Sequence, residues 1–307
     1  MNGLHTKAFR RAAAGAVAGL LGAAVTWALM APSIAPARAA ASGAIPDFSS
    51  GGWGLDNPGD PTAYQRVPGD TGPGPVMQHP DFPYSTDSRE DVRRMADTGN
   101  PVLRPAVKAK MDVEVARVMA GVLATRAKSE DALTGIAFVP TSRCWPGGVP
   151  GVHLYTGDVF FIQRPDEVWI IQTRDAPRRI YLNVPHQDGP QYSWFGDAVA
   201  HYEGGDTLVV DTIALDDKGP IDRLNTPHSK QLHVTERYTL IDGGGRMRVT
   251  IHVEDPAVFT QPFQAMVEYE HLAGASWDEW VCNENSTEYF IPPEELVPVP
   301  SAVKRDF

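Results

Sequence analysis

The sequence predicts a mainly β fold, in which an antiparallel meander of strands closes into a lipocalin-like barrel or packs as a sandwich. Three observations support this. After Pro140, apolar and polar residues alternate in short segments, which is the period of a half-buried strand. Short turns rich in Gly and Asp separate several of these segments. No helical period interrupts them, which disfavours parallel βαβ units.

Residues 1–39 read as a cleaved signal peptide. Lys7, Arg10 and Arg11 precede the apolar run 12–31, and Ala37-Arg38-Ala39 fits the small-residue cleavage rule. A transmembrane anchor is the alternative, since about 20 apolar residues can span a bilayer, but this run is mostly Ala and Gly. The residues flanking the arginine pair do not fit the twin-arginine pattern, so we expect ordinary secretion to the periplasm or the medium.

Residues 40–100 are expected to form an extended arm. The stretch 42–105 holds 10 Pro and 9 Gly, a composition that predicts neither helix nor sheet. The residue pattern changes over 101–130. Apolar residues recur there at helical spacing, and Pro105 suits a first helical turn. We predict one amphipathic helix there, packing on the core.

Residues 131–307 are expected to form the barrel-like domain. The turn signals 164–167, 203–206 and 242–245 separate several of its predicted strands. These strands are 159–164, 168–173, 179–183, 207–214, 232–241, 247–254 and 263–271.

The net charge of the chain argues against some classes of binding partner. The chain of 307 residues has a net charge of −11, and loss of the leader, with four basic residues and no acidic ones, takes it to −15. Nucleic acids and anionic membrane surfaces attract basic patches, so neither is expected to bind, nor is stable membrane insertion after cleavage. No standard catalytic fingerprint is present, and the oligomeric state stays open.

Two carboxylates stand in apolar rows. Glu236 shares a strand face with Leu232, Val234 and Tyr238, and Asp211 shares one with Val209 and Ile213. If both strands face one cavity, the pair would serve as general acid and base. The alternative is a buried Glu236 that is paired with an Arg or Tyr for structural reasons.

Histidines and aromatic residues complete the predicted site. His186 and His228 lie in turn-rich segments and are the candidate catalytic histidines, since imidazole titrates near neutral pH. Arg179 is expected to point inward and Arg178 outward. The other candidate substrate-binding residues are His201, Tyr202, Trp169 and His233. No histidine pair has the H-x-x-x-H spacing of a helical metal site, and His228 and His233, five residues apart across a loop–strand junction, are weak evidence for a metal, so neither metal nor cofactor is expected.

The two cysteines, Cys144 and Cys282, are expected to form a disulfide, because export places them in an oxidising compartment. The alternative is a nucleophilic cysteine, which would need a nearby base and a lowered pKa.

A set of motifs resembles a widespread family of exported bacterial β-rich proteins without an assigned function. The resemblance spans about 135–290. It rests on Arg143–Pro150, Arg179–Leu182 with His186, Tyr202–Thr212, Pro227–Tyr238 and Val281–Asn285. It implies a secreted β-rich domain, and it favours the disulfide because both cysteines fall within matching segments. The chain departs from the family's Gly-x-Ser-x-Gly pattern at 196–202, which implies a different ligand or chemistry if that loop borders the pocket.

We therefore expect an exported, cofactor-independent enzyme that uses carboxylate and histidine acid–base chemistry. Its substrate would be a small, largely apolar or aromatic molecule, and the reaction an elimination, isomerisation, cyclisation or hydrolysis. The alternative is a periplasmic protein that binds an apolar ligand without catalysis. A third possibility is a surface interaction module, suggested by the Pro/Gly-rich arm.

Overall fold

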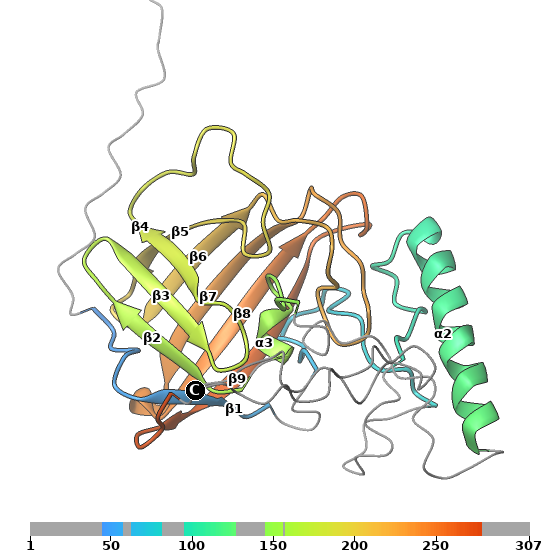
Figure 1. The fold of residues 1–307 in the computed structure, drawn as a ribbon, viewed down its shortest axis with the longest axis horizontal. Helices are drawn as coiled ribbons and strands as arrows, with labels where there is room; N and C mark the ends of the chain where they lie inside the picture. The colour runs from blue at the N-terminus through green and yellow to red at the C-terminus, as the bar shows by residue number, and fades with distance from the viewer. Residues whose placement is uncertain (1–44, 58–62, 82–94, 127–144, 156, 278–307) are drawn as a thin grey trace, which may run out of the picture. The chain divides into compact units, whose positions relative to one another are not determined.

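A closed barrel forms the centre of the chain (Figure 1). The computed structural model describes residues 45–57, 63–81, 95–126, 145–155 and 157–277. Within them, nine strands pair in chain order, and the last pairs with the first. The strands are β1 (Gly52–Leu55), β2 (Val159–Gln163), β3 (Glu167–Gln172), β4 (Arg178–Leu182), β5 (Asp197–Glu203), β6 (Thr207–Ile213), β7 (His233–Ile241), β8 (Arg246–Glu254) and β9 (Phe263–Leu272). The expected mainly β barrel is confirmed.

The alternating apolar and polar residues of the strands form the inner and outer faces of the barrel wall. In β8, Met247, Val249, Ile251 and Val253 are almost fully buried, while the residues between them are only half-buried. The buried rows of the strands meet in a single core. In the described chain, β7, β8 and β9 are the longest strands and pair over most of their length.

Two strands were not predicted. β1 lies in the Pro/Gly-rich arm, and it closes the barrel by pairing Gly52 with both Leu272 of β9 and Phe160 of β2. The expectation that the arm holds no sheet is therefore wrong at these residues. A Cβ on Gly52 would lie 2.8 Å from the Ala275 side chain and 2.9 Å from the Phe160 ring, so a residue without a side chain permits this close approach. β5 is the second, and its inward row has only the small residues Ala198 and Ala200 besides Tyr202.

One strand pair departs from the expected meander. β4 and β5 are parallel, with Tyr181 opposite Val199 and Leu182 opposite Ala200. A parallel pair needs a connection that returns the chain to the starting edge, and residues 183–196 supply it. This crossover loop extends beyond the strand ends in Figure 1. It holds His186 and Tyr192, which therefore lie on a loop fixed at both ends by the sheet.

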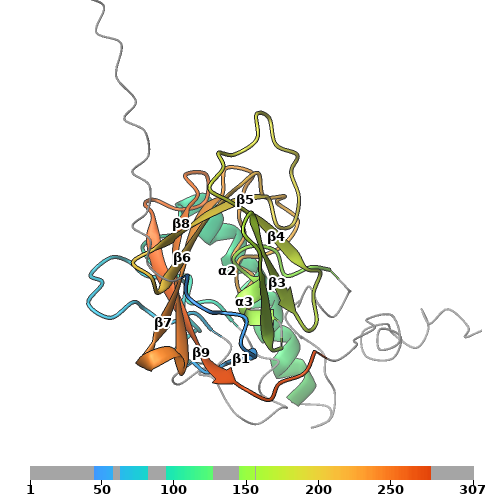
Figure 2. The ribbon, with the colours of Figure 1, turned by 90° about the vertical axis from the view of Figure 1, so that its left-hand side faces the viewer.

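Two α-helices accompany the barrel in the described part of the chain. α2 (Pro105–Arg126), whose ribbon is labelled in Figure 2, begins at the predicted proline. Its Met111, Val107 and Val115 pack on the core. α3 (Val152–Tyr155) is a single turn whose residues Val152, His153 and Leu154 are buried. A 3₁₀ turn, η2 (Asp242–Gly244), joins β7 and β8.

Candidate functional site

The structure separates the two predicted carboxylates. Glu236 pairs across the ladder with Val210, and the next residue along, Asp211, pairs with Thr235. Adjacent residues of a strand point to opposite faces, so Glu236 lies in the core and Asp211 lies on the outer face. The expectation that both line one cavity is therefore wrong. They belong to two clusters, an inner one around Glu236 and an outer one around Asp211.

The inner cluster satisfies Glu236 completely. Arg178 donates to its two oxygens at 3.0 and 2.5 Å, and His153 Nε2 lies 2.7 Å from Oε1. Tyr238 donates a further hydrogen bond of 3.0 Å, and the other nitrogen of His153 contacts the Tyr269 hydroxyl at 2.8 Å. All five side chains are buried. The only described polar atom of this cluster without a hydrogen-bond partner is Arg178 Nε.

This pairing sets the charge of Glu236. Burial alone would raise its pKa, but the charge of Arg178 and the hydrogen bond from His153 outweigh burial and lower the pKa to about 2. A carboxylate so firmly ionised is a poor general acid near neutral pH. The structural alternative, Glu236 paired with an Arg and a Tyr, is what the structure contains.

Arg178, not Arg179, is the inward arginine. Arg178 shares its row with the buried Ile180 and Leu182, whereas Arg179 lies outside, where its guanidinium bonds Glu167 at 2.6 Å and stacks on Trp169 and Tyr181. The predicted inward orientation of Arg179 is therefore wrong. Trp169 is on the same outer face, so neither residue lines the barrel interior.

The outer cluster joins a loop and three strands. Asp211 of β6 accepts hydrogen bonds from His186 Nε2 at 2.8 Å, His233 Nε2 at 2.7 Å and Thr235 at 3.0 Å. The second nitrogen of His186 lies 2.8 Å from Asp197 Oδ2. Asp197 is held in turn by the backbone N–H of Gln187, at 3.0 Å.

His186 and His233 differ in how many of their ring nitrogens are hydrogen-bonded. Both ring nitrogens of His186 are engaged by carboxylates. His233 is engaged only through Nε2, and its Nδ1 has no hydrogen-bond partner in the described part of the chain. The His233 side chain is 38% exposed. Asp211 and His233 thus form a dyad in which the carboxylate orients the ring and one nitrogen stays available for proton transfer.

Mutual pairing tunes both members of this dyad. Partial burial acts to raise the pKa of Asp211, but the hydrogen bonds from His233 and His186 outweigh it, and the pKa lies well below its ordinary value. The hydrogen bond to Asp211 raises the pKa of His233, against a smaller opposing effect of burial. Asp211 therefore stays ionised and holds a histidine that is more basic than usual.

A surface pocket of about 450 Å³ adjoins the dyad. His233 lines it, together with the crossover loop, the end of β6 and the segment that leads into β7. Its apolar wall includes Pro190, Tyr192, Ile213 and Leu232. The volume falls within the range of small-molecule sites, which is about 300–1,000 Å³.

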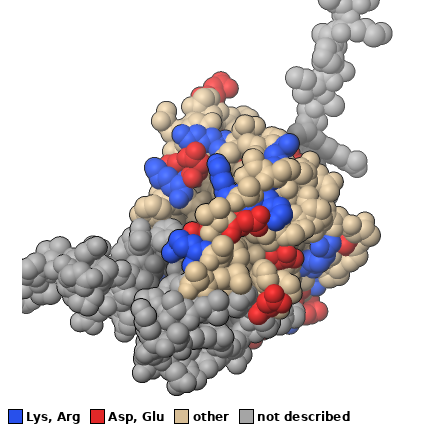
Figure 3. Space-filling view, turned by 90° about the vertical axis from the view of Figure 1, so that its right-hand side faces the viewer, with Lys and Arg blue, Asp and Glu red and all other residues tan. Residues whose placement is uncertain are grey.

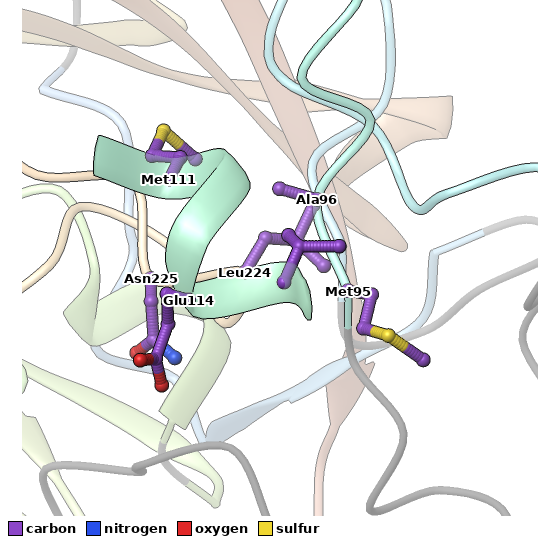
Figure 4. Close-up of a pocket in the computed structure, with 7 residues that line it drawn as sticks. Met95, Ala96, Met111, Glu114, Leu224 and Asn225 are labelled. Atoms are coloured by element: carbon purple, nitrogen blue, oxygen red, sulfur yellow. The ribbon is translucent and has the colours of Figure 1, made fainter. Parts of the chain in front are cut away.

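A second pocket, under α2, is too small for a substrate. Figure 4 shows Met95, Met111 and Leu224 around it, with Glu114 and Asn225 at one side. Its volume is about 20 Å³, which is room for roughly one water molecule. Neither of the two pockets is lined by Glu236.

The remaining predicted residues lie apart from the dyad. His228 bonds the carbonyl of Ser229 at 3.2 Å, and burial lowers its pKa. His201 is exposed and pairs with Glu203 at 2.8 Å. Tyr202 accepts a hydrogen bond from Gln163 and packs on the core. Cys144 and Cys282, like the leader, lie outside the described residues.

Several residues of the two clusters and of the pocket were not predicted from the sequence. His153 belongs to a one-turn helix 83 residues from Glu236, and no local pattern connects the two. The inward position of Arg178 was readable, since it alternates with Ile180 and Leu182. Asp197, Tyr192 and Lys230 carried no signal beyond their position near predicted turns.

Comparison of the chain with protein-family models and with curated proteins gave no match. Within the described residues, no group of three or more His, Cys, Asp and Glu side chains has a metal-binding arrangement. No helix in the same part of the chain is long and apolar enough to span a membrane. On the face shown in Figure 3, basic and acidic side chains are interspersed.

Proposed function

We propose that the chain is an exported, cofactor-independent enzyme that performs general acid–base chemistry on a small, largely apolar or aromatic molecule. The observation that carries the proposal is the Asp211–His233 dyad, whose histidine lines a pocket of substrate size and has no hydrogen-bond partner at Nδ1 in the described chain. The role of base moves from Glu236 to His233, because Glu236 is enclosed and fully paired. Asp211 and His186, which were predicted as catalytic residues, remain part of the proposed site, where they position His233.

The proposed reaction is a proton transfer at His233 Nδ1. Neutral His233 accepts a proton from the bound molecule at Nδ1, and the resulting imidazolium is stabilised by ionised Asp211. Return of that proton to another carbon of the same molecule is an isomerisation. Its transfer to a leaving group, as a double bond forms, is an elimination. Both reactions leave the enzyme unchanged and consume no co-reactant.

His233→Asn tests the proposal. The Asn amide lies near the position of Nδ1 but is not a base, and it does not reach Asp211, which contacts Nε2, so turnover should fall by about 10²–10⁴-fold. The assay follows isomerisation, elimination and deuterium uptake by NMR, in D₂O, over a panel of small apolar and aromatic molecules that includes any ligand copurified from the host. His201→Asn is the matched control, since His201 also pairs with a carboxylate on the outer face.

Undiminished turnover in the His233 variant would place the base elsewhere. A copurified ligand that the protein binds in this pocket without changing it would favour the alternative function, binding without catalysis. The apolar wall that includes Pro190 and Ile213 supports that alternative, since it provides burial for a ligand whether or not His233 reacts with it.

A further inference from the structure

The pocket beside His233 contains a positive charge that makes no ion pair with a described residue. Lys230 lines it, is exposed, and its ammonium lies 5.2 Å from the centre of the Tyr192 ring. No ion pair joins Lys230 to any described carboxylate. The nearby Asp216 is already paired with Lys218 at 2.5 Å. Lys230 is therefore held over an aromatic ring, with no acidic partner in contact.

The lining of this pocket is one-sided in charge. No Asp or Glu is among the residues that line it, and its ionisable side chains are Lys230, His233 and the Tyr192 phenol. The nearest acidic group of the dyad, Asp211, is taken up by two histidines and Thr235. Two carboxylates outside the lining act on these groups: Glu254, opposite His233 across the β7–β8 ladder, and Asp216, which interacts electrostatically with Lys230. The lining itself carries only groups that favour an anion.

The same pocket offers a surface for a flat apolar group. Tyr192 is 52% exposed, which is unusual for so large a side chain, and Pro190 and Ile213 continue the apolar surface. Large exposed aromatic residues at a pocket are typical of ligand contacts rather than of folding.

We infer that the ligand is a small carboxylate with an aromatic or flat apolar body. Its carboxylate pairs with Lys230, its body lies against Tyr192 and the apolar wall, and the hydrogen to be removed faces His233 Nδ1. This inference names the substrate class of the proposed enzyme and rests on that function for the reaction only. Binding itself depends on Lys230 and Tyr192.

Titration of the full chain with phenylacetate, monitored by ¹H–¹⁵N NMR, tests the inference. Phenylacetamide has the same shape without the charge, and phenethylamine has the opposite charge. Phenylacetate should bind saturably and shift the amides of Tyr192, Lys230 and His233, whereas phenylacetamide should bind about fivefold more weakly and phenethylamine weaker still. Binding of phenylacetate should weaken as salt is added, because the pair is close to the surface.

Lys230→Met should weaken phenylacetate binding about fivefold and leave phenylacetamide binding unchanged. Lys110→Met is the matched control, because it makes the same change in net charge at an exposed position of α2 outside the pocket, and it should have no effect. Equal affinity for phenylacetate and phenylacetamide, no binding of phenylacetate, or an unaltered affinity in Lys230→Met would each overturn the inference.

The two proposals fail separately. If His233→Asn binds phenylacetate normally and no carboxylate is turned over by the unmodified protein, the inferred ligand class stands and the enzymatic function falls. If turnover requires His233 but is equally fast with neutral substrates, the function stands and the inferred class falls.

Discussion

Asp211 and Glu236 lie on neighbouring strands, and each contacts a histidine, yet their surroundings are opposite. Glu236 is inaccessible to solvent and is bonded by Arg178, His153 and Tyr238. Asp211 is half-buried, is bonded by two histidines and a threonine, and supports a histidine with one nitrogen free beside a pocket. The contrast teaches that an inward carboxylate in this barrel stabilises the fold, whereas a carboxylate on the outer wall, under the crossover loop, is available for chemistry.

The largest expected effect is on stability, from Glu236→Gln. The substitution leaves Arg178 buried without its counter-charge, which should lower the free energy of unfolding by about 3–5 kcal/mol. Urea unfolding followed by tryptophan fluorescence measures this loss. Turnover per folded molecule should stay within about twofold of the unmodified protein. Normal stability together with abolished turnover would reverse the roles of the two clusters.

A smaller effect on stability, and a larger one on turnover, is expected from Asp211→Asn. Turnover should fall by about 10²–10⁴-fold, as the ring of His233 is no longer oriented by a charge. Because ionised Asp211 raises the pKa of His233, and only the neutral ring is a base, the rising limb of the pH–rate profile should move to lower pH in the variant. A profile that keeps its position would show that Asp211 does not tune the base.

The stability of the same variant has a defined pH window. The raised pKa of His233 gives stability that is present below about pH 6.5 and lost as the pH rises through the folded value. The lowered pKa of Asp211 gives stability that is present above about pH 4 and lost as the pH falls through the folded value. The difference in unfolding free energy between the two proteins should therefore be greatest between these limits, at about 1–2 kcal/mol.

The smallest effect is expected from His201→Ala. His201 and Glu203 repeat the carboxylate–histidine contact at 2.8 Å, but both side chains are about half exposed. An exposed pair contributes little, so stability should change by no more than about 0.5 kcal/mol and turnover should not change. A loss of turnover would restore the predicted role of His201 in substrate binding and extend the site along β5.

The sequence predicted the barrel because its long strands alternate cleanly. In β7 and β8 the period identifies the buried row, and Glu236 lies in the apolar row in which it was predicted. The period fails in β6, where Thr207 to Val210 are buried on both faces. Alternation then cannot say which row faces inward, and Asp211 was assigned to the same cavity as Glu236.

The candidate site was predicted in part, as residues without their geometry. Asp211, His186 and His233 were all named, yet the role of base was assigned to Glu236. Which histidine keeps a free nitrogen depends on hydrogen bonds between a loop and two strands, and no local pattern encodes these. Lys230 and Tyr192 are brought into one pocket by the crossover loop, whose path follows from the parallel pairing of β4 and β5.

Closure of the barrel by β1 has a consequence for how the protein folds. The pairing of Gly52 with Leu272 joins positions 220 residues apart, so the ring of strands cannot be completed until β9 has been synthesised. Such long-range pairing makes folding slow, because the entropy of closing a long loop is lost before the contacts form. The ring of strands therefore closes only when β1, in the extended arm, meets both β2 and β9, so the arm is part of the barrel wall.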